Sequence, residues 1–449
     1  MMGVVQLISE YSDMVNKTSY RMSTVTNLCD QQVLSFIDCR VEWLKRFLYC
    51  CVPWYHYHSL VLRLTAWLTQ AVHLSKAVVR RSNSPPESLH HVHVLVRFIN
   101  LLIEPRVRSL DLSSMPKVLK DCVYRQLDKM TGLERLSLGS GNGESIRQQS
   151  FVSLKMLTNL TDLSLQSDCQ NSTLAIIGQN CSRLTRLDIS SSGGVTEQGT
   201  PWLLLCQQLN TLNLFQTSQS VAGYAQLVQG LPRLTSVGRC DMFGEMMEYI
   251  ERLRSDPPQL GITHLHTRDM TYHQLQLTVT YCPDIEHVNL YVDEDLGHLL
   301  SPLSRLHRLH QVKLLACNFY SDRVDRLITE KGADLTLLHL EHIDQLDMSA
   351  LRLIAQSCPN LEKLVFFSCD FVENFGANLA EEILPAASLG KLQSLVCVSE
   401  CAPNVIEFLL THAKFLSTVQ FGSTAWFNDD IVSSILVRYK SLLIIYFLV

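Results

Sequence analysis

Histidines and cysteines near the N-terminus are the first side chains whose types could support chemistry. Zinc sites normally combine such residues in a CxxC pair or in an HxxxH pair, and this segment has neither pattern. Cys50 and Cys51 are adjacent, which is awkward for tetrahedral ligation. We therefore predict solvated or partly buried histidines and no metal site. The histidines concerned are His56, His58, His90, His91 and His93.

A glycine-rich stretch is the second candidate. Gly139, Gly141 and Gly143 superficially resemble a dinucleotide-binding loop, but the full GxGxxG order and a downstream acidic residue are missing. The chain also lacks the GxSxG, HExxH and P-loop motifs of common enzymes. We therefore expect no cofactor and no catalytic activity. An enzyme whose catalytic residues are dispersed along the chain is a remote alternative.

A recurring leucine pattern indicates which elements must position the functional side chains. Residues 335–340 have apolar side chains at the spacing LxxLxL, and residues 361–366 repeat the pattern 26 residues later. The segment between them, Ala350–Ala355, has the apolar spacing of an amphipathic helix. A short strand and a two-turn helix cannot bury an apolar face alone, so this unit is stable only when copies of it stack.

The same unit recurs over most of the chain, at spacings of 23 to 31 residues. Leucine-rich repeats have periods of roughly 20–29 residues. We therefore predict an α/β leucine-rich-repeat solenoid, a horseshoe of about 14 repeats with an all-helical N-terminal cap. Its helices include Tyr224–Gly230, Gln274–Tyr281 and Ala350–Ser357. The first apolar positions of the repeats are Val107, Leu133, Leu160, Leu184, Leu209, Leu234, Ile262, Ile285, Leu309, Leu335, Leu361, Leu392, Leu416 and Leu442.

Strand alternation predicts which side chains reach the concave face of the horseshoe. The leucines of LxxLxL point into the core, so the residues between them point to the concave side. Aromatic residues are enriched in protein-binding hot spots, and histidines make binding sensitive to pH. We therefore predict a protein-binding concave face that contains Arg186, Asp188, Phe215, His264, His266, His287, Tyr291, His339, Glu341 and Phe367.

Charge and hydropathy exclude two classes of partner. The net charge of the 449 residues is −5, so no global basic field points to nucleic acid. The longest apolar stretch near the N-terminus is interrupted by Arg63, His73 and Lys76, which argues against a membrane span. The first residues lack the basic start and apolar core of a signal peptide. We expect a cytoplasmic or nuclear protein without membrane contact.

Six of the 15 cysteines lie at fixed positions of the repeat. Positions fixed by a repeat indicate small buried residues of the stack rather than disulfide partners, and this favours a reducing compartment. Cys181, Cys206, Cys282 and Cys358 lie three residues before a first apolar position, and Cys317 and Cys369 lie three residues after a last one.

Three segments are expected. Residues 1–26 are polar and predicted to be flexible, and residues 27–104 have helical apolar spacing, interrupted at 80–88 by two adjacent prolines. Residues 105–449 hold the repeats. The chain ends on an apolar strand without its helix, so we expect a truncated product or a partial gene model.

The unit from Cys358 through Leu361 to Cys369 resembles the cysteine-containing leucine-rich repeats of F-box/leucine-rich-repeat proteins. Cys181, Cys206 and Cys282 match the first half of that pattern. The resemblance implies a protein-binding horseshoe that presents substrates to a cullin–RING ubiquitin ligase. No Leu-Pro pair, which usually opens an F-box, occurs in the first hundred residues.

Two functions therefore stay open. The first is a non-catalytic substrate-recognition subunit of a cullin–RING, SCF-type ubiquitin ligase. It would bind a protein substrate on the concave face and a cullin adaptor through residues 27–104. The second is a stand-alone scaffold or inhibitor that uses the concave face without a ligase, with residues 27–104 acting as a cap.

Overall fold

The computed structural model describes residues 103–113, 123, 126–139, 153–253, 258–292, 299–372, 389–422 and, as backbone, 444–448. The chain divides into two compact units. The first unit runs to Leu209 and includes Gln216–Ser218, and the second comprises Asn210–Phe215 and continues from Gln219. The predicted flexible N-terminus, the predicted helical segment up to residue 102 and the N-terminal histidines lie outside the described residues.

In the first unit, short parallel strands pair in the order of the chain. Helices follow the later strands, because each repeat must return to the start of the next strand. The strands are β1 (Ser109–Asp111), β2 (Arg135–Ser137), β3 (Asp162–Ser164) and β4 (Arg186–Asp188); the helices are α6 (Asn171–Asn180) and α7 (Thr200–Leu203), with the 3-10 helices η1 (Leu127–Lys129) and η3 (Glu197–Gly199).

In the second unit, parallel strands again pair in chain order. Its strands are β5 (Thr211–Asn213), β6 (Ser236–Arg239), β7 (His264–Arg268), β8 (His287–Tyr291), β9 (Gln311–Asn318), β10 (Leu337–Asp344), β11 (Lys363–Phe367), β12 (Ser394–Val398), β13 (Thr418–Gly422) and β14 (Ile444–Leu448). Its helices are α8 (Val221–Gly230), α9 (Phe243–Leu253), α10 (Tyr272–Tyr281), α11 (Val324–Lys331), α12 (Met348–Ser357) and α13 (Pro403–His412), with η4 (Ser301–Arg305) and η5 (Gly332–Asp334).

The apolar residues of successive strands form one buried column. Each strand from β1 to β14 begins two residues after the first apolar position of a predicted repeat. In the second unit Leu265 pairs with Val288, Val288 with Val312, and Val312 with Leu338. All four side chains are buried. Stacking therefore buries the apolar face that a single strand would expose, which confirms the predicted α/β leucine-rich-repeat architecture.

Helices α8, α10 and α12 begin earlier than apolar spacing predicts, because a polar cap precedes the first apolar residue of each. Ser220 Oγ accepts a hydrogen bond from the backbone N–H of Gly223 at 3.0 Å, so α8 begins at Val221 rather than Tyr224. Thr271 forms a reciprocal capping box at the start of α10, and Asp347 caps α12. The predicted starts of these helices were therefore two or three residues late.

A left-handed residue recurs at one position of the repeat, seven residues after the first apolar position. It lies within β9 and β10 and just beyond the end of the shorter strands. Residues other than glycine adopt this conformation rarely, so it recurs here because the repeat geometry requires it. The positions are Ser167, Ser191, Gln216, Asp269, Ala316, His342 and Ser368.

The repeat cysteines are buried, as predicted. Cys181, Cys206, Cys282 and Cys358 have no exposed surface, and every cysteine of the described residues is a buried free thiol. Burial raises the pKa of Cys358 to about 12, so this thiol is a neutral packing group. Within the described ranges, the longest apolar helices are too short to span a membrane.

Candidate functional site

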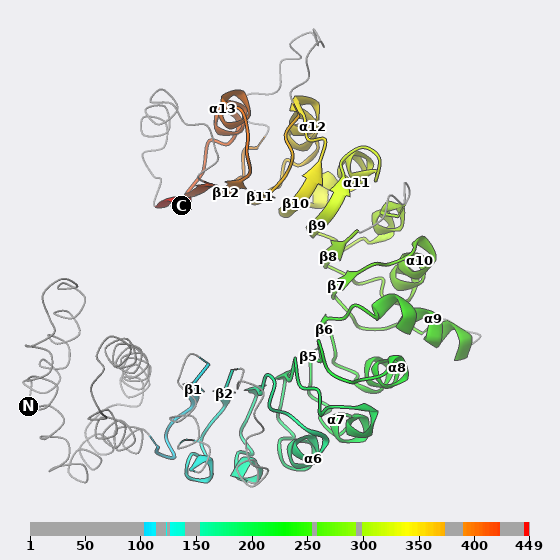
Figure 1. The fold of residues 1–449 in the computed structure, drawn as a ribbon, viewed down its shortest axis with the longest axis vertical. Helices are drawn as coiled ribbons and strands as arrows, with labels where there is room; N and C mark the ends of the chain where they lie inside the picture. The colour runs from blue at the N-terminus through cyan, green and yellow to red at the C-terminus, as the bar shows by residue number, and fades with distance from the viewer. Residues whose placement is uncertain are drawn as a thin grey trace, which may run out of the picture. The chain divides into compact units, whose positions relative to one another are not determined.

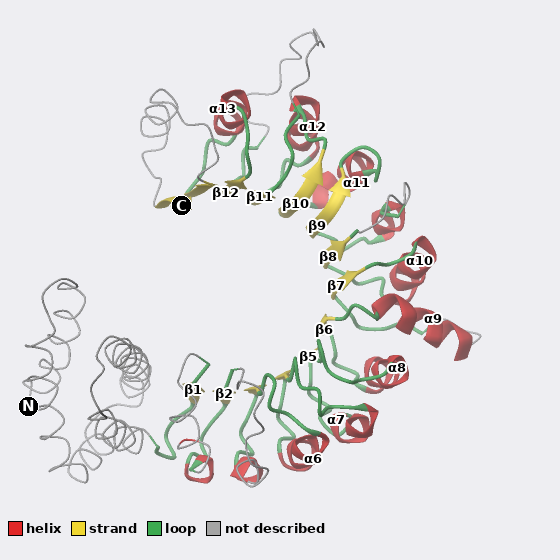
Figure 2. Cartoon of the chain, viewed as in Figure 1, coloured by secondary structure: helices red, strands yellow, loops and turns green. Residues whose placement is uncertain are grey.

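Helices α8 to α12 lie on one side of the strands of the second unit (Figure 1, Figure 2). The opposite side of β5 to β11 is called the strand face here. Along β7, the outward His264 and His266 alternate with the buried Leu265 and Thr267. This is the alternation expected of a strand with one face in the core. The other predicted residues of this unit, all exposed or half-buried, are Phe215, His287, Tyr291, His339, Glu341 and Phe367.

A bulge in β6 changes which residues reach the strand face. Ser236 pairs with His264, but Arg239, three residues later, pairs with His266, so β6 carries one residue more than β7 at this point. The extra residue is accommodated at Gly238, whose φ is +65°. A glycine in the left-handed region is the usual way to build such a bulge. Arg239 therefore takes the outward position, and Cys240 takes the buried one.

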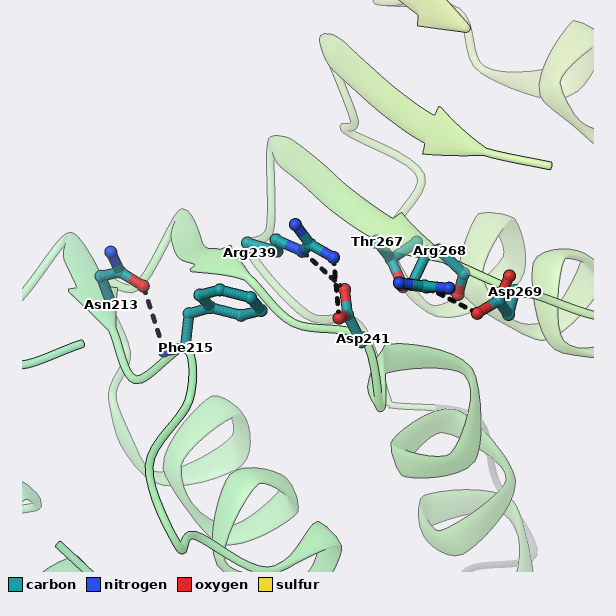
Figure 3. Close-up of polar contacts among 7 residues, drawn as sticks. All are labelled: Asn213, Phe215, Arg239, Asp241, Thr267, Arg268 and Asp269. Atoms are coloured by element: carbon teal, nitrogen blue, oxygen red, sulfur yellow. Dashed lines mark hydrogen bonds and ion pairs between the residues drawn. The ribbon is translucent and has the colours of Figure 1, made fainter. Parts of the chain in front are cut away.

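Arg239 is held rigidly at the strand face by two neighbours (Figure 3). Its guanidinium lies over the ring of Phe215, with Cζ 4.4 Å from the ring centroid. Its Nε and Nη2 donate to the two carboxylate oxygens of Asp241 at 2.9 and 3.0 Å. Asn213 accepts a hydrogen bond from the backbone N–H of Phe215 and so fixes the chain beneath the ring. The cation–π contact and the bidentate pair together leave the guanidinium little rotational freedom.

Histidines from three successive repeats lie in contact next to this pair. The rings of His264 and His287 stack with their centroids 4.2 Å apart, and His310 meets His287 edge-on at 4.8 Å. Burial and then the neighbouring His287 lower the pKa of His264. Burial and then Arg239 lower the pKa of His266, with Lys313 acting in the same direction and Asp241 opposing. These two rings are therefore neutral at pH 7.

Lys313 on β9 and Glu341 on β10 form a second charged pair. Lys313 Nζ lies 2.7 Å from Glu341 Oε2, and both side chains are largely buried. His339 Nε2 is 3.3 Å from the same oxygen. Burial and then Lys313 lower the pKa of His339 to about 4, against the opposing effect of Glu341. The contact between His339 and Glu341 is therefore not an ion pair at neutral pH.

The end of β7 carries another cation stacked on an aromatic ring. Arg268 Cζ lies 5.1 Å from the centroid of the Tyr291 ring, and Arg268 Nε donates to Asp269 Oδ2 at 2.6 Å (Figure 3). A hydrogen bond to Asp269 raises the pKa of Arg268. The arrangement repeats the combination of aromatic ring, arginine and aspartate seen at Phe215, Arg239 and Asp241.

The strand face has a shallow hollow of about 280 Å³, which crosses β6 to β10. The strands themselves form its floor at Leu265, Val288 and Val312, whose side chains are buried on the opposite side of the sheet. Polar side chains of β7, β8 and β9 form its walls. These are His264, His266, His287, Asn289, Gln311 and Lys313.

Three of the predicted residues lie apart from this cluster. Arg186 and Asp188 belong to β4 of the first unit, where Arg186 forms an ion pair with Asp162 and Asp188 accepts a hydrogen bond from Gln166 at 2.7 Å. Phe367 ends β11 in the second unit and is 38% exposed, with its ring edge-on to His342 at 6.5 Å.

Sequence reasoning missed Arg239, Asp241 and Arg268. The sequence did carry a signal for the first. In the repeat that begins at Leu234, an arginine occupies the third apolar position and Cys240 follows it, which indicates a slip of one residue after Gly238. Arg268 follows the last apolar position of its repeat, and no signal distinguishes it from other polar residues at strand ends.

The donor set does not favour metal chemistry. Across the described ranges, no group of three or more histidine, cysteine, aspartate or glutamate side chains is placed to hold a metal ion. The stacked imidazoles of His264 and His287 face each other through their rings rather than converging on a point. What the strand face offers is fixed hydrogen-bond donors, paired charges and exposed ring surfaces.

The repeat period, the parallel strands in chain order and the buried apolar column define an α/β leucine-rich-repeat protein. No protein-family model matches the chain, and no curated protein matches it. Several solved structures are similar to it at low identity, and those described next are leucine-rich-repeat proteins.

Yeast Rad7, solved in complex with Elc1, is similar over 95% of this chain and 93% of its own, with 15% identity and a TM-score of 0.42. A leucine-rich-repeat protein of Leptospira interrogans is similar over 81% of this chain and 93% of its own, with 14% identity and a TM-score of 0.36. The internalin InlF of Listeria monocytogenes is similar over 78% of this chain and 82% of its own, with 13% identity and a TM-score of 0.34.

Proposed function

We propose that the chain is a non-catalytic protein-recognition subunit and that the strand face of the second unit binds its partner. The observation that carries the proposal is Arg239, held over Phe215 and tied to Asp241 while its side chain stays 37% exposed. Arginines and aromatic rings dominate binding hot spots. A side chain that is already ordered loses little conformational entropy when a partner binds.

The balance of charge on the strand face favours a protein over a nucleic acid. Nucleic-acid sites depend on cations that are free to neutralise phosphates. Here Arg239 is paired with Asp241, Lys313 with Glu341 and Arg268 with Asp269. Paired charges fix the register of a complementary surface.

The size of the hollow favours a protein over a cofactor or a metabolite. Its volume of about 280 Å³ lies below the roughly 300–1,000 Å³ of small-molecule pockets. The cation–aromatic pairs outside its lining, at Phe215 and at Tyr291, extend the surface beyond what a small ligand would cover.

For the class of complex, we propose a substrate receptor of a cullin–RING ubiquitin ligase. The support is the cysteine-containing repeat type, with Cys358, Leu361 and Cys369 all buried in one repeat. In this proposal the strand face holds the substrate, and residues 27–104 hold the adaptor. A stand-alone scaffold would use the same strand face and recover no ligase.

Affinity purification of the full chain from cells tests both parts of the proposal. The variant Arg239→Ala removes the hot-spot cation. Arg252→Ala is the matched control, because Arg252 is an exposed arginine on α9 that pairs only loosely with Glu248, at 3.5 Å. We expect Arg239→Ala, and not Arg252→Ala, to lose a protein partner, while a cullin and its adaptor stay bound to all three chains.

The binding role of the strand face and the ligase role can fail separately. If no partner depends on Arg239, the strand face is not the binding surface. If an Arg239-dependent partner is recovered without any cullin, the ligase role fails and the scaffold function replaces it.

A further inference from the structure

The walls of the strand-face hollow are made entirely of side chains that can donate hydrogen bonds. His264, His266 and His287 supply imidazole N–H groups, Asn289 and Gln311 supply amide N–H groups, and Lys313 supplies an ammonium. No aspartate or glutamate is among the residues that line the hollow. The imidazoles and amides can also accept hydrogen bonds, but Lys313 can only donate, and its matching partner is a group that only accepts, such as an ionised carboxylate.

Two carboxylates close to the hollow, Asp241 and Glu341, are each paired with a cation. Asp241 accepts both of its hydrogen bonds from Arg239, and Glu341 is paired with Lys313 at 2.7 Å. These pairs hold a cation at each side of the hollow, one from β6 and one from β9. Lys313 also lines the hollow, so its ammonium has hydrogen-bonding capacity beyond the single contact with Glu341.

Lys313 carries the only formal charge among the side chains that line the hollow, and Glu341, which pairs with it, lies outside the lining. Burial is the largest cause that lowers the pKa of His266, and Arg239 and Lys313 act in the same direction against Asp241. A cation in the wall favours an anionic group in the hollow.

We propose that the hollow receives the carboxylate side chain of an aspartate or glutamate from an acidic segment of the protein partner. The inference rests on the proposed function, because it assumes that the strand face binds a protein. A hollow of about 280 Å³ admits one side chain while the rest of the segment lies across the strands. The side chains of the walls bind the carboxylate.

Selection of a random dodecapeptide phage library on the immobilised full chain tests the occupant. We expect the selected peptides to be enriched in aspartate and glutamate. A fluorescein-labelled copy of the strongest peptide is then titrated by anisotropy against the wild type, Lys313→Gln, Lys313→Arg, Lys363→Gln and Arg239→Ala. Lys363 is an exposed lysine at the start of β11 and does not line the hollow, so it is the matched control for the loss of one positive charge.

Lys313→Gln is expected to weaken peptide binding about tenfold, the usual size of a lost hydrogen bond to a charged group. Lys313→Arg and Lys363→Gln should stay within about threefold of the wild type. Replacing the critical acidic residue of the peptide by its amide should weaken binding to the wild type and have little further effect on Lys313→Gln. Thermal melts verify that each variant is folded.

A second test is the pH dependence of peptide binding. A bound carboxylate favours the charged form of His266, whose surrounding groups are Arg239, Asp241 and Lys313. Binding should therefore take up protons, and the peptide should bind more tightly at pH 6 than at pH 7.5 in the wild type.

The outcomes separate the two proposals. If the selected peptides lack acidic residues, or if Lys313→Gln binds them as well as the wild type, while Arg239→Ala abolishes binding, the strand face binds protein but the acidic occupant is wrong. If peptides bind and neither variant matters, the strand face is not the binding surface. Failure to enrich any peptide over an uncoated surface counts against both proposals.

Discussion

Gly238 on β6 and Asn213 on β5 are packed so closely that no side chain fits between them. A Cβ atom at Gly238 would lie 2.7 Å from Asn213 Oδ1, the oxygen that accepts the hydrogen bond from the Phe215 backbone. The φ of Gly238 is +65°, in the left-handed region that favours glycine. The bulge that brings Arg239 to the strand face and the backbone beneath Phe215 therefore depend on the same glycine.

Gly238→Ala should consequently cost about 1–3 kcal/mol of unfolding free energy, from the left-handed backbone and the displaced Asn213 together. Gly261→Ala is the control. A Cβ at Gly261 makes only an ordinary contact of 3.5 Å with the Leu234 carbonyl oxygen, and its backbone is not left-handed. That substitution should change stability by less than about 1 kcal/mol. Urea unfolding of both variants measures the difference, and equal midpoints would refute the packing argument.

The fold could be predicted from sequence because one physical requirement repeats along the chain. Leu265, Val288, Val312 and Leu338 are each the second apolar residue of an LxxLxL pattern, and stacking them is the only way to bury every copy. Helix starts were less accurate, because apolar spacing does not register polar caps such as Ser220. The recurring left-handed residues were not predicted. Glycine is the usual sequence signal for this conformation, and none of the seven recurring residues is a glycine.

The candidate site was only partly predictable, because strand alternation does not register an irregular strand. Simple alternation placed His264 and His266 on the strand face, but it fails wherever a strand gains a residue, and the bulge at Gly238 hid Arg239. Alternation also cannot tell which strands share a compact unit. It grouped Arg186 with residues that belong to the second unit.

Stability should depend on pH through His339. Burial and Lys313 lower its folded-state pKa to about 4, against a reference value of 6.5, while Glu341 opposes and Lys363 assists. Between these two values the unfolded chain binds a proton that the folded chain does not. The free energy of unfolding therefore falls as the pH drops from 6.5 towards 4, by up to about 3 kcal/mol from this group.

The test is the urea midpoint of the wild type and of His339→Gln at pH 7.5 and pH 5. The variant should lose less stability on acidification than the wild type does. His273→Gln replaces an exposed histidine on α10 and should behave like the wild type. An equal loss in all three chains would show that His339 is not the group responsible.

Cys358 should tolerate alanine better than serine. Its side chain is fully buried and packs near Gly332, where a Cβ would lie only 2.9 Å from the sulfur. Serine is similar in shape but buries a hydroxyl without an assured acceptor, at a cost of about 1–3 kcal/mol. Alanine leaves only a small void. Thermal melts of Cys358→Ser and Cys358→Ala rank the two, and a more stable serine variant would mean that this position is polar rather than a packing position.

Asp347 couples two successive repeats through one carboxylate oxygen. Its Oδ1 accepts hydrogen bonds from the Ala350 backbone N–H at 2.7 Å and from the Tyr320 hydroxyl at 2.6 Å. The hydroxyl comes from the turn after β9, and the backbone N–H belongs to the first turn of α12. Burial and then the hydrogen bond to Asp347 raise the pKa of Tyr320. Asp347→Ala should cost about 1–2 kcal/mol, as expected for a lost helix cap.

A double-mutant cycle separates the cap from the contact between repeats. Asp347→Asn retains an oxygen for the cap and should cost less than Asp347→Ala. Tyr320→Phe alone should cost about 0.5–1.5 kcal/mol, the net contribution of one hydrogen bond. Adding Tyr320→Phe to Asp347→Ala should then cost almost nothing further, because the shared acceptor is already gone. Additive losses in unfolding free energy would show that the two hydrogen bonds act independently and that the carboxylate does not couple the repeats.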